Sequence, residues 1–107
     1  MELRYYKDAQ DRAPLTRWLD DLKDIRARAQ IKARLARVGA GNFGDCKPLR
    51  DGVQELKIDY GPGYRVYLSR QVPVIVLLLS GSDKGDQDRA IKQAIEYLND
   101  WKQRGKP

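Results

Sequence analysis

Alternating apolar and polar residues mark most of the strands that the sequence predicts. Residues 2–6 alternate over a short stretch, and residues 53–59 and 64–70 alternate on either side of a turn-forming GPG at 61–63. Residues 73–80 are apolar at almost every position, which predicts an interior strand buried on both faces. The last three strands follow one another through short turns, so the sequence predicts an antiparallel meander.

Three other segments repeat apolar residues every three or four positions, which predicts amphipathic helices. These segments are residues 14–24, about 25–38 and about 87–103, and Pro14 suits the first turn of a helix. The predicted order is a short N-terminal strand, two helices, three strands and a C-terminal helix. This order is typical of a single α+β domain over residues 1–107, in which we expect the helices to cover one face of the sheet.

The alternation also fixes which side chains share a face, because a slip of one residue would turn every apolar side chain outward. Five apolar residues must then face the helices: Leu56, Ile58, Tyr64, Val66 and Leu68. Glu55, Lys57, Arg65 and Tyr67 share the opposite face, which we expect to be open. One interpretation is a cross-strand ion pair of Glu55 with Arg65 or Lys57, contributing at most about 1 kcal/mol. The other is a phosphate site at which Tyr67 stacks on or hydrogen-bonds a nucleotide.

Charge adds a partner class to this picture. The chain carries 21 Lys and Arg against 15 Asp and Glu, a formal net charge of +6. This excess favours a polyanionic partner such as nucleic acid, although a basic surface also serves solubility. Arg26, Arg34 and Arg37 on the second predicted helix are candidate RNA contacts. Lys84 precedes the last predicted helix, whose first backbone N–H groups also favour an anion.

The absence of histidine excludes several kinds of site. Histidine-based acid–base pairs, Ser-His-Asp triads and His-ligated metal sites are all ruled out. The aspartates in residues 83–88 lack the spacing of a calcium loop, so we expect no metal and no cofactor. A single cysteine, no apolar leader and no apolar run long enough to span a membrane predict a cytoplasmic protein.

Much of the chain resembles a known family. The stretch NFGDCKPLRDGVQELKIDYGPGYRVYL, the later LLSGSDKGDQDRAI and the helix pair PLTRWLDDLKDIRARAQIKARLARV are similar to the RelE/ParE toxin superfamily. The similarity is greatest to its phage-derived addiction-module killer proteins, the HigB-like branch. It implies a RelE-like fold and a toxin of a type II toxin–antitoxin system that cleaves mRNA on the ribosome without a metal. It also implies a separately encoded helix-turn-helix antitoxin as partner.

The resemblance extends to individual residues. Arg65 matches the family's arginine that contacts the scissile phosphate, and Lys57 lies near the family's lysines. Lys84 stands where many relatives carry a basic residue, and either Lys57 or Glu55 is a candidate general base. The C-terminal histidine or tyrosine that some relatives use is not evident in this chain.

Two other functions remain open from the sequence. A ParE-like inhibitor of DNA gyrase would share the fold without nuclease chemistry. A non-catalytic RNA- or protein-binding module would use the basic second helix, so that Arg26, Arg34 and Arg37 would matter more than Arg65.

Overall fold

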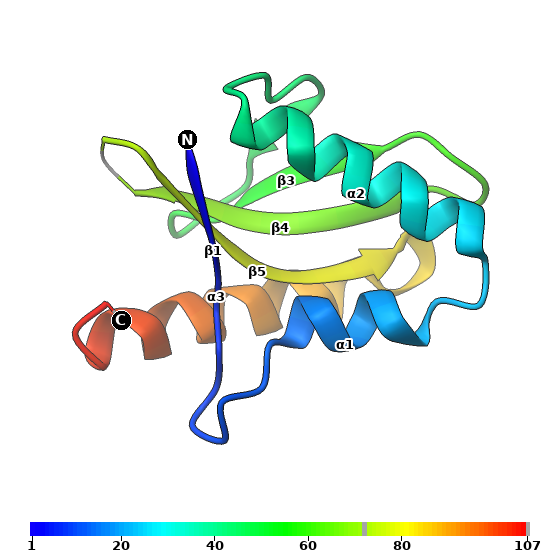
Figure 1. The fold of residues 1–107 in the computed structure, drawn as a ribbon. Helices are drawn as coiled ribbons and strands as arrows, with labels where there is room; N and C mark the ends of the chain where they lie inside the picture. Colours follow the sequence, from blue (N-terminus) through cyan, green and yellow to red (C-terminus); the bar gives the residue numbers. More distant parts are fainter. Residues whose placement is uncertain (72, 107) are drawn as a thin grey trace.

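The computed structural model describes residues 1–71 and 73–106 and consists of a five-stranded sheet with helices on both faces (Figure 1). The elements follow one another along the chain as β1 (Glu2–Tyr5), α1 (Pro14–Asp21), α2 (Ile25–Gly39), β2 (Cys46–Pro48), β3 (Gln54–Ile58), β4 (Tyr64–Gln71), β5 (Ile75–Asp83), the short 3₁₀ helix η1 (Lys84–Asp86) and α3 (Gln87–Gln103). The α+β class agrees with the prediction, and α3 has the predicted bounds.

The sheet is mixed, with the strand order β1-β5-β4-β3-β2. Strands β2 to β5 form antiparallel pairs, and β1 lies parallel to β5 with Leu3 opposite Val76. The prediction that β5 is an interior strand is confirmed, since it lies between β1 and β4. The predicted order of elements is wrong in one respect, because β2 was not expected. Its three residues show no alternation and include Pro48, which suits only the edge of a sheet.

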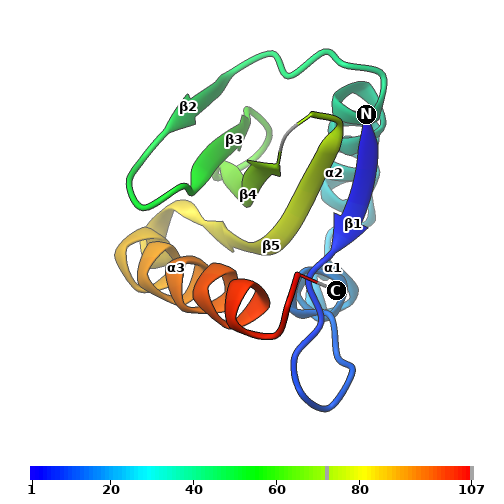
Figure 2. The same cartoon turned by 90° about the vertical axis from the view of Figure 1, so that its left-hand side faces the viewer.

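Two apolar cores lie on opposite faces of the sheet. On one face α1 and α2 pack against the sheet through side chains that include Leu15, Ile31, Leu56 and Val66. On the other face α3 packs against a second group of apolar residues: Tyr6, Val53, Tyr67, Leu77 and Leu79. Figure 2 shows the strands lying between α3 and α2. The prediction that helices cover only one face is therefore wrong.

The helix ends explain how α1 and α2 are joined. Helix α1 ends at Asp21 instead of the predicted residue 24, and α2 begins at Ile25. Asp24 caps α2, because its Oδ1 accepts hydrogen bonds from the backbone N–H groups of Arg26 at 2.9 Å and Ala27 at 3.2 Å. This cap sets the bend between the two helices.

Helix α1 approaches β5 closely at one glycine. A Cβ atom added to Gly81 would lie 2.3 Å from the ring of Trp18, so only glycine leaves room for the indole. Trp18 also meets Tyr64 edge to face, with ring centroids 6.0 Å apart. The contact holds α1 against the end of β5 that leads into η1.

Candidate functional site

Five polar side chains come together on the α3 side of the sheet, near the point where α3 begins. We call them the polar cluster: Glu55 on β3, Arg65 and Tyr67 on β4, Ser82 on β5 and Gln87 at the start of α3. The register places Glu55 opposite Tyr67 and Arg65 opposite Ser82. Three members were candidates from the sequence, whereas Ser82 and Gln87 were not.

The polar cluster lies on one face as the alternation predicted, but that face is not open. Glu55 exposes 3% of its surface, Arg65 exposes 8%, and Tyr67 exposes none. The expectation of an open face is wrong because α3 carries an apolar stripe that must be buried, and Tyr67, Leu77 and Leu79 form the surface that buries it. Glu55 and Arg65 lie beneath the start of α3 and are therefore covered together with this core.

Glu55 connects the members of the cluster. Its Oε2 accepts a hydrogen bond from Gln87 Nε2 at 2.7 Å and lies 3.7 Å from Arg65 Nε. Its Oε1 lies 3.9 Å from Nζ of Lys47, a largely exposed residue on β2. The cross-strand ion pair between Glu55 and Arg65 is thus present, and it is buried. Lys47 was missed because the strand that carries it was not predicted.

Arg65 is only partly satisfied by this pairing. Its Nε and Nη1 atoms are buried, and neither has a hydrogen-bond partner among the described residues. Burying a guanidinium group is costly unless its donors are paired, so these atoms would gain from a further acceptor. Gly63 lies beside the group, since a Cβ at this position would be 3.6 Å from Nη1. Arg65 is therefore a cation with unused donors at the end of the β3–β4 hairpin.

Tyr67 belongs to the core and does not reach a ligand from the surface. Its hydroxyl lies 3.0 Å from Ser82 Oγ, and burial raises the pKa of the phenol above its ordinary value. The predictions that Tyr67 binds RNA and stacks on a base are wrong, because a ring without exposed surface offers no stacking face.

The two lysines of the predicted site are exposed. Lys57 lies directly opposite Arg65 in the register of β3 and β4. Lys84 begins η1, two residues after Ser82, which pairs with Arg65. The structure thus places Lys57 and Lys84 on either side of the strand that carries Arg65, with Glu55 beneath α3. These are the four residues for which a catalytic role was predicted.

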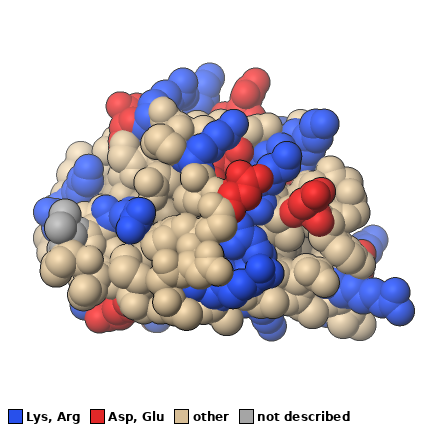
Figure 3. Space-filling view, turned by 90° about the horizontal axis from the view of Figure 1, so that it is seen from above, with Lys and Arg blue, Asp and Glu red and all other residues tan. Residues whose placement is uncertain are grey.

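The arginines of α2 differ in exposure. Arg26 and Arg37 are exposed, so they stay candidates for RNA contacts. Arg34 is buried, and its guanidinium donates to the backbone carbonyls of Phe43 at 3.1 Å, Asp45 at 3.4 Å and Lys57 at 3.3 Å. The prediction that Arg34 binds RNA is wrong. Figure 3 looks onto the α2 side of the molecule and shows separate groups of Lys and Arg side chains there, with acidic groups between some of them.

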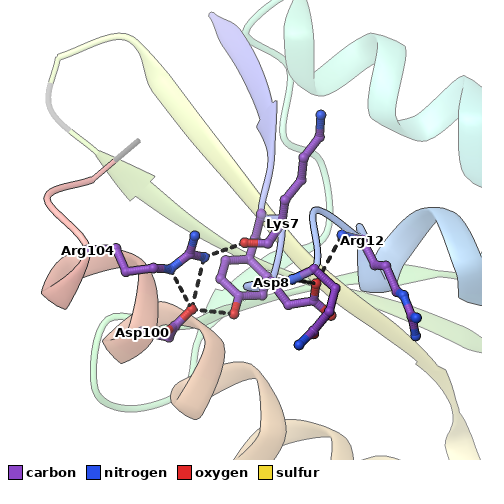
Figure 4. A network of polar contacts seen from close by, with 7 residues as sticks. Lys7, Asp8, Arg12, Asp100 and Arg104 are labelled. Carbon is purple, nitrogen blue, oxygen red and sulfur yellow. Dashed lines mark hydrogen bonds and ion pairs between the residues drawn. The ribbon is translucent and has the colours of Figure 1, made fainter.

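A separate polar network joins the N-terminal segment to α3. Tyr6 donates a hydrogen bond to Asp100 Oδ2 at 2.6 Å, and Arg104 donates to the same oxygen at 2.9 Å and to the backbone carbonyl of Lys7 (Figure 4). Burial first, and then the hydrogen bond to Asp100, raises the pKa of Tyr6 to about 12. This network lies apart from the polar cluster and fixes the end of β1 against the last turns of α3.

Among residues 1–71 and 73–106, no three His, Cys, Asp or Glu residues come close enough to hold a metal ion together. No helix within these ranges is both long enough and apolar enough to cross a membrane.

The chain has a close relative in a bacterium. No family model matches the sequence. A Haemophilus influenzae protein described as uncharacterized is 57% identical over 77 residues, which are 72% of this chain and 78% of the relative. The chain belongs to the same family as this Haemophilus protein.

Proposed function

We propose that the chain is a type II toxin of the RelE/ParE kind, in its HigB-like branch, and that it cleaves ribosome-bound mRNA in the cytoplasm. The observation that carries this proposal is the setting of Arg65 on β4, where Glu55 lies 3.7 Å from its Nε and 8% of the residue stays exposed. Exposed Lys57 and Lys84 flank its strand. An arginine flanked by two exposed lysines suits a phosphodiester.

The proposed reaction uses the 2′-hydroxyl of the RNA as nucleophile. Attack on the neighbouring phosphorus breaks the bond to the 5′-oxygen of the next nucleotide and leaves a 2′,3′-cyclic phosphate. Arg65 stabilises the negative charge that develops at phosphorus, with Lys84 beside it. A base removes the proton of the 2′-hydroxyl, and an acid protonates the departing 5′-oxygen. No metal or cofactor takes part in this scheme.

The geometry favours Lys57 over Glu55 as the base. Glu55 is buried and already bound to Gln87, Arg65 and Lys47, so its oxygens do not reach a substrate at the surface. Lys57 is exposed and lies opposite Arg65. Glu55 then acts as a positioning residue, which keeps the Arg65 guanidinium oriented.

Dependence on the ribosome follows from how little of Arg65 is exposed. Free RNA would meet only the edge of the guanidinium, and productive attack needs the 2′-oxygen, the phosphorus and the leaving oxygen in line. The ribosome holds mRNA in a fixed geometry and supplies this alignment. The proposed antitoxin, a helix-turn-helix protein, would block the toxin by binding it.

Mapping of mRNA 5′ ends after brief induction in bacteria tests the proposal. We expect new ends inside translated codons with the natural chain, and a loss of about 10²-fold or more in cleavage with Arg65→Ala. Lys57→Ala changes an exposed residue and separates loss of chemistry from loss of folding, and circular dichroism of the purified variants checks the fold. Growth arrest with intact transcripts would overturn the proposal and direct the search to DNA gyrase.

A further inference from the structure

A hollow of about 290 Å³ lies between α2, the loop that follows it and the end of β3. We call it the α2–β3 groove. Its polar side chains come from three separate segments: Gln30, Arg37, Asn42, Asp45, Lys57 and Asp59. This volume is at the lower limit of small-molecule sites and suits one nucleotide or a group of similar size.

The floor of the groove is rigid because Arg34 joins its walls. The three carbonyls that accept from Arg34 belong to the loop and to β3, so one buried side chain fixes both to α2. Gly44 has a φ of +59°, and a Cβ there would lie 3.1 Å from Arg34 Nη1. The backbone N–H of Lys57 donates to Asp45 O at 3.0 Å, a further link across the groove. A site built this way needs little ordering when a ligand binds.

The walls offer both hydrogen-bond donors and acceptors. Two amides, Gln30 and Asn42, provide one of each, and the carboxylates of Asp45 and Asp59 add acceptors beside the donors of Arg37 and Lys57. The side chains of these residues make no hydrogen bond or ion pair within residues 1–71 and 73–106. They are therefore free to bind a ligand in the groove.

This lining suits a nucleobase better than a phosphate. Two carboxylates would repel a phosphate, whereas the edge of a base presents donors and acceptors together and is read by side chains of this kind. Lys57 lines the groove and also lies opposite Arg65. The groove lies on the α2 side of the sheet and the Arg65 guanidinium on the α3 side, so a strand that binds at both must pass around the edge of β3 at Lys57.

We propose that the α2–β3 groove binds a base of the RNA strand whose phosphate lies at Arg65 and that it sets the base preference of the protein. The inference rests on the proposed function, because it concerns the same strand. Asn42 and Asp59 discriminate between bases, and Arg37 and Lys57 hold the strand at the rim. Arg34 is a positioning residue that keeps the groove in shape.

Binding of short 2′-O-methyl RNA oligonucleotides tests the inference, since a methylated 2′-oxygen cannot attack and the probe stays intact. A set that differs at one base is titrated by fluorescence anisotropy against the natural chain and against Asn42→Ala and Asp59→Ala. We expect the ratio between the best and worst base to fall by about tenfold in each variant. Arg37→Ala should weaken binding of every member of the set.

Lys32→Ala is the matched control for Arg37→Ala, because it removes one exposed positive charge from the same helix outside the groove. It should lower all affinities slightly and leave the base ratio unchanged. A ratio that is unchanged in both Asn42→Ala and Asp59→Ala, or a natural chain without any base preference, would overturn the inference. The probe needs no catalysis, so a chain that cleaves mRNA but fails this assay refutes the groove alone. A chain that reads bases without cleaving refutes only the proposed nuclease.

Discussion

Arg65 and Glu55 illustrate how burial changes the meaning of an ion pair. On an open sheet their attraction would be worth little, because water screens it and the side chains must be ordered. Beneath α3 each charge has lost most of its water, so each depends on the other. Removing one partner of a buried pair is costly, because the remaining charge is left uncompensated.

Glu55→Gln should lower the free energy of unfolding by about 3 kcal/mol. The amide still accepts the hydrogen bond from Gln87, so the loss reports mainly the missing charge beside Arg65. Urea unfolding followed by circular dichroism measures it. Glu2→Gln removes the exposed partner of Arg4 and should cost less than about 1 kcal/mol. Equal losses in the two variants would contradict a buried pair.

Tyr6 should make the fold sensitive to alkali. Its pKa is raised to about 12 in the folded chain, whereas an unfolded tyrosine titrates near pH 10, at about the model-peptide value. The contribution of Tyr6 to the free energy of unfolding is therefore complete below pH 10 and is lost as the pH rises toward 12. The reason is that the Tyr6 phenol loses its proton at a lower pH in the unfolded chain than in the folded chain. Between these limits we expect Tyr6 to account for about 3 kcal/mol of lost stability.

Urea unfolding midpoints measured from pH 9 to pH 12, in steps of about one pH unit, would follow this loss of stability. Tyr6→Phe should flatten the decline, while Tyr5→Phe, which changes an exposed ring, should leave it as it is. A natural chain and a Tyr6→Phe variant with parallel profiles would show that the Tyr6 phenol does not govern the alkaline range.

At the scale of elements, Arg34 joins α2 to the loop and to β3. Arg34→Met retains the apolar stem but removes all three hydrogen bonds to carbonyls, and we expect a loss of about 2 kcal/mol. The amide of Lys57 should then exchange its hydrogen faster, because its acceptor Asp45 O is no longer fixed. Hydrogen exchange followed by NMR detects this. Arg37→Met is the matched control, and the same acceleration in both would argue against the clamp.

The contact between α1 and β5 is testable at its glycine. Gly81→Ala places a methyl group within the indole of Trp18, and we expect destabilisation of about 2 kcal/mol, seen as a lower thermal midpoint. Gly85→Ala should change the midpoint little, since a Cβ there would meet Asp83 at an ordinary 3.6 Å. Combining Gly81→Ala with Trp18→Leu should restore part of the loss if the clash is its cause.

The sequence predicted the elements better than it predicted how they pack. The alternation in β3 and β4 correctly separated Leu56 and Val66 from Glu55 and Arg65, because the period of a strand is a local property. It did not identify the face that α3 covers, since an amphipathic helix has an apolar stripe but no information about its partner. The apolar residues on both sides of β5 contained that information: Leu77 and Leu79 needed a cover that α1 and α2 could not provide.

The same distinction applies to the candidate site. The sequence indicated Arg65, Glu55 and Lys57, because charged residues on a strand are unusual. It could not show that Gln87 binds Glu55, a contact across 32 residues that depends on where α3 begins. Arg34 and Arg37 are equivalent in the sequence pattern. The position of the loop after α2 decides that one is buried beneath carbonyls and the other is exposed.

At the scale of the whole molecule, the net charge of +6 predicts how binding responds to salt. Each phosphate neutralised on a single strand contributes about −0.7 to the slope of log affinity against log salt. Contacts from Arg65, Lys57 and Arg37 to three phosphates would give a slope of about −2 with the uncleavable RNA. Anisotropy titrations at several salt concentrations measure it, and a slope near zero would contradict a strand bound along this basic surface.

The parallel pairing of β1 with β5 ties the first residues of the chain to residues far along it. Glu2 lies opposite Ile75, so the N-terminal strand has no neighbour until most of the chain has been synthesised. Helix α3, which covers Arg65 and Glu55, comes later still. A chain that ends early, through a nonsense codon or an interrupted message, therefore lacks both the central strand and the cover of the polar cluster. Such fragments should be unfolded and quickly degraded, so that only a finished chain acts in the cell.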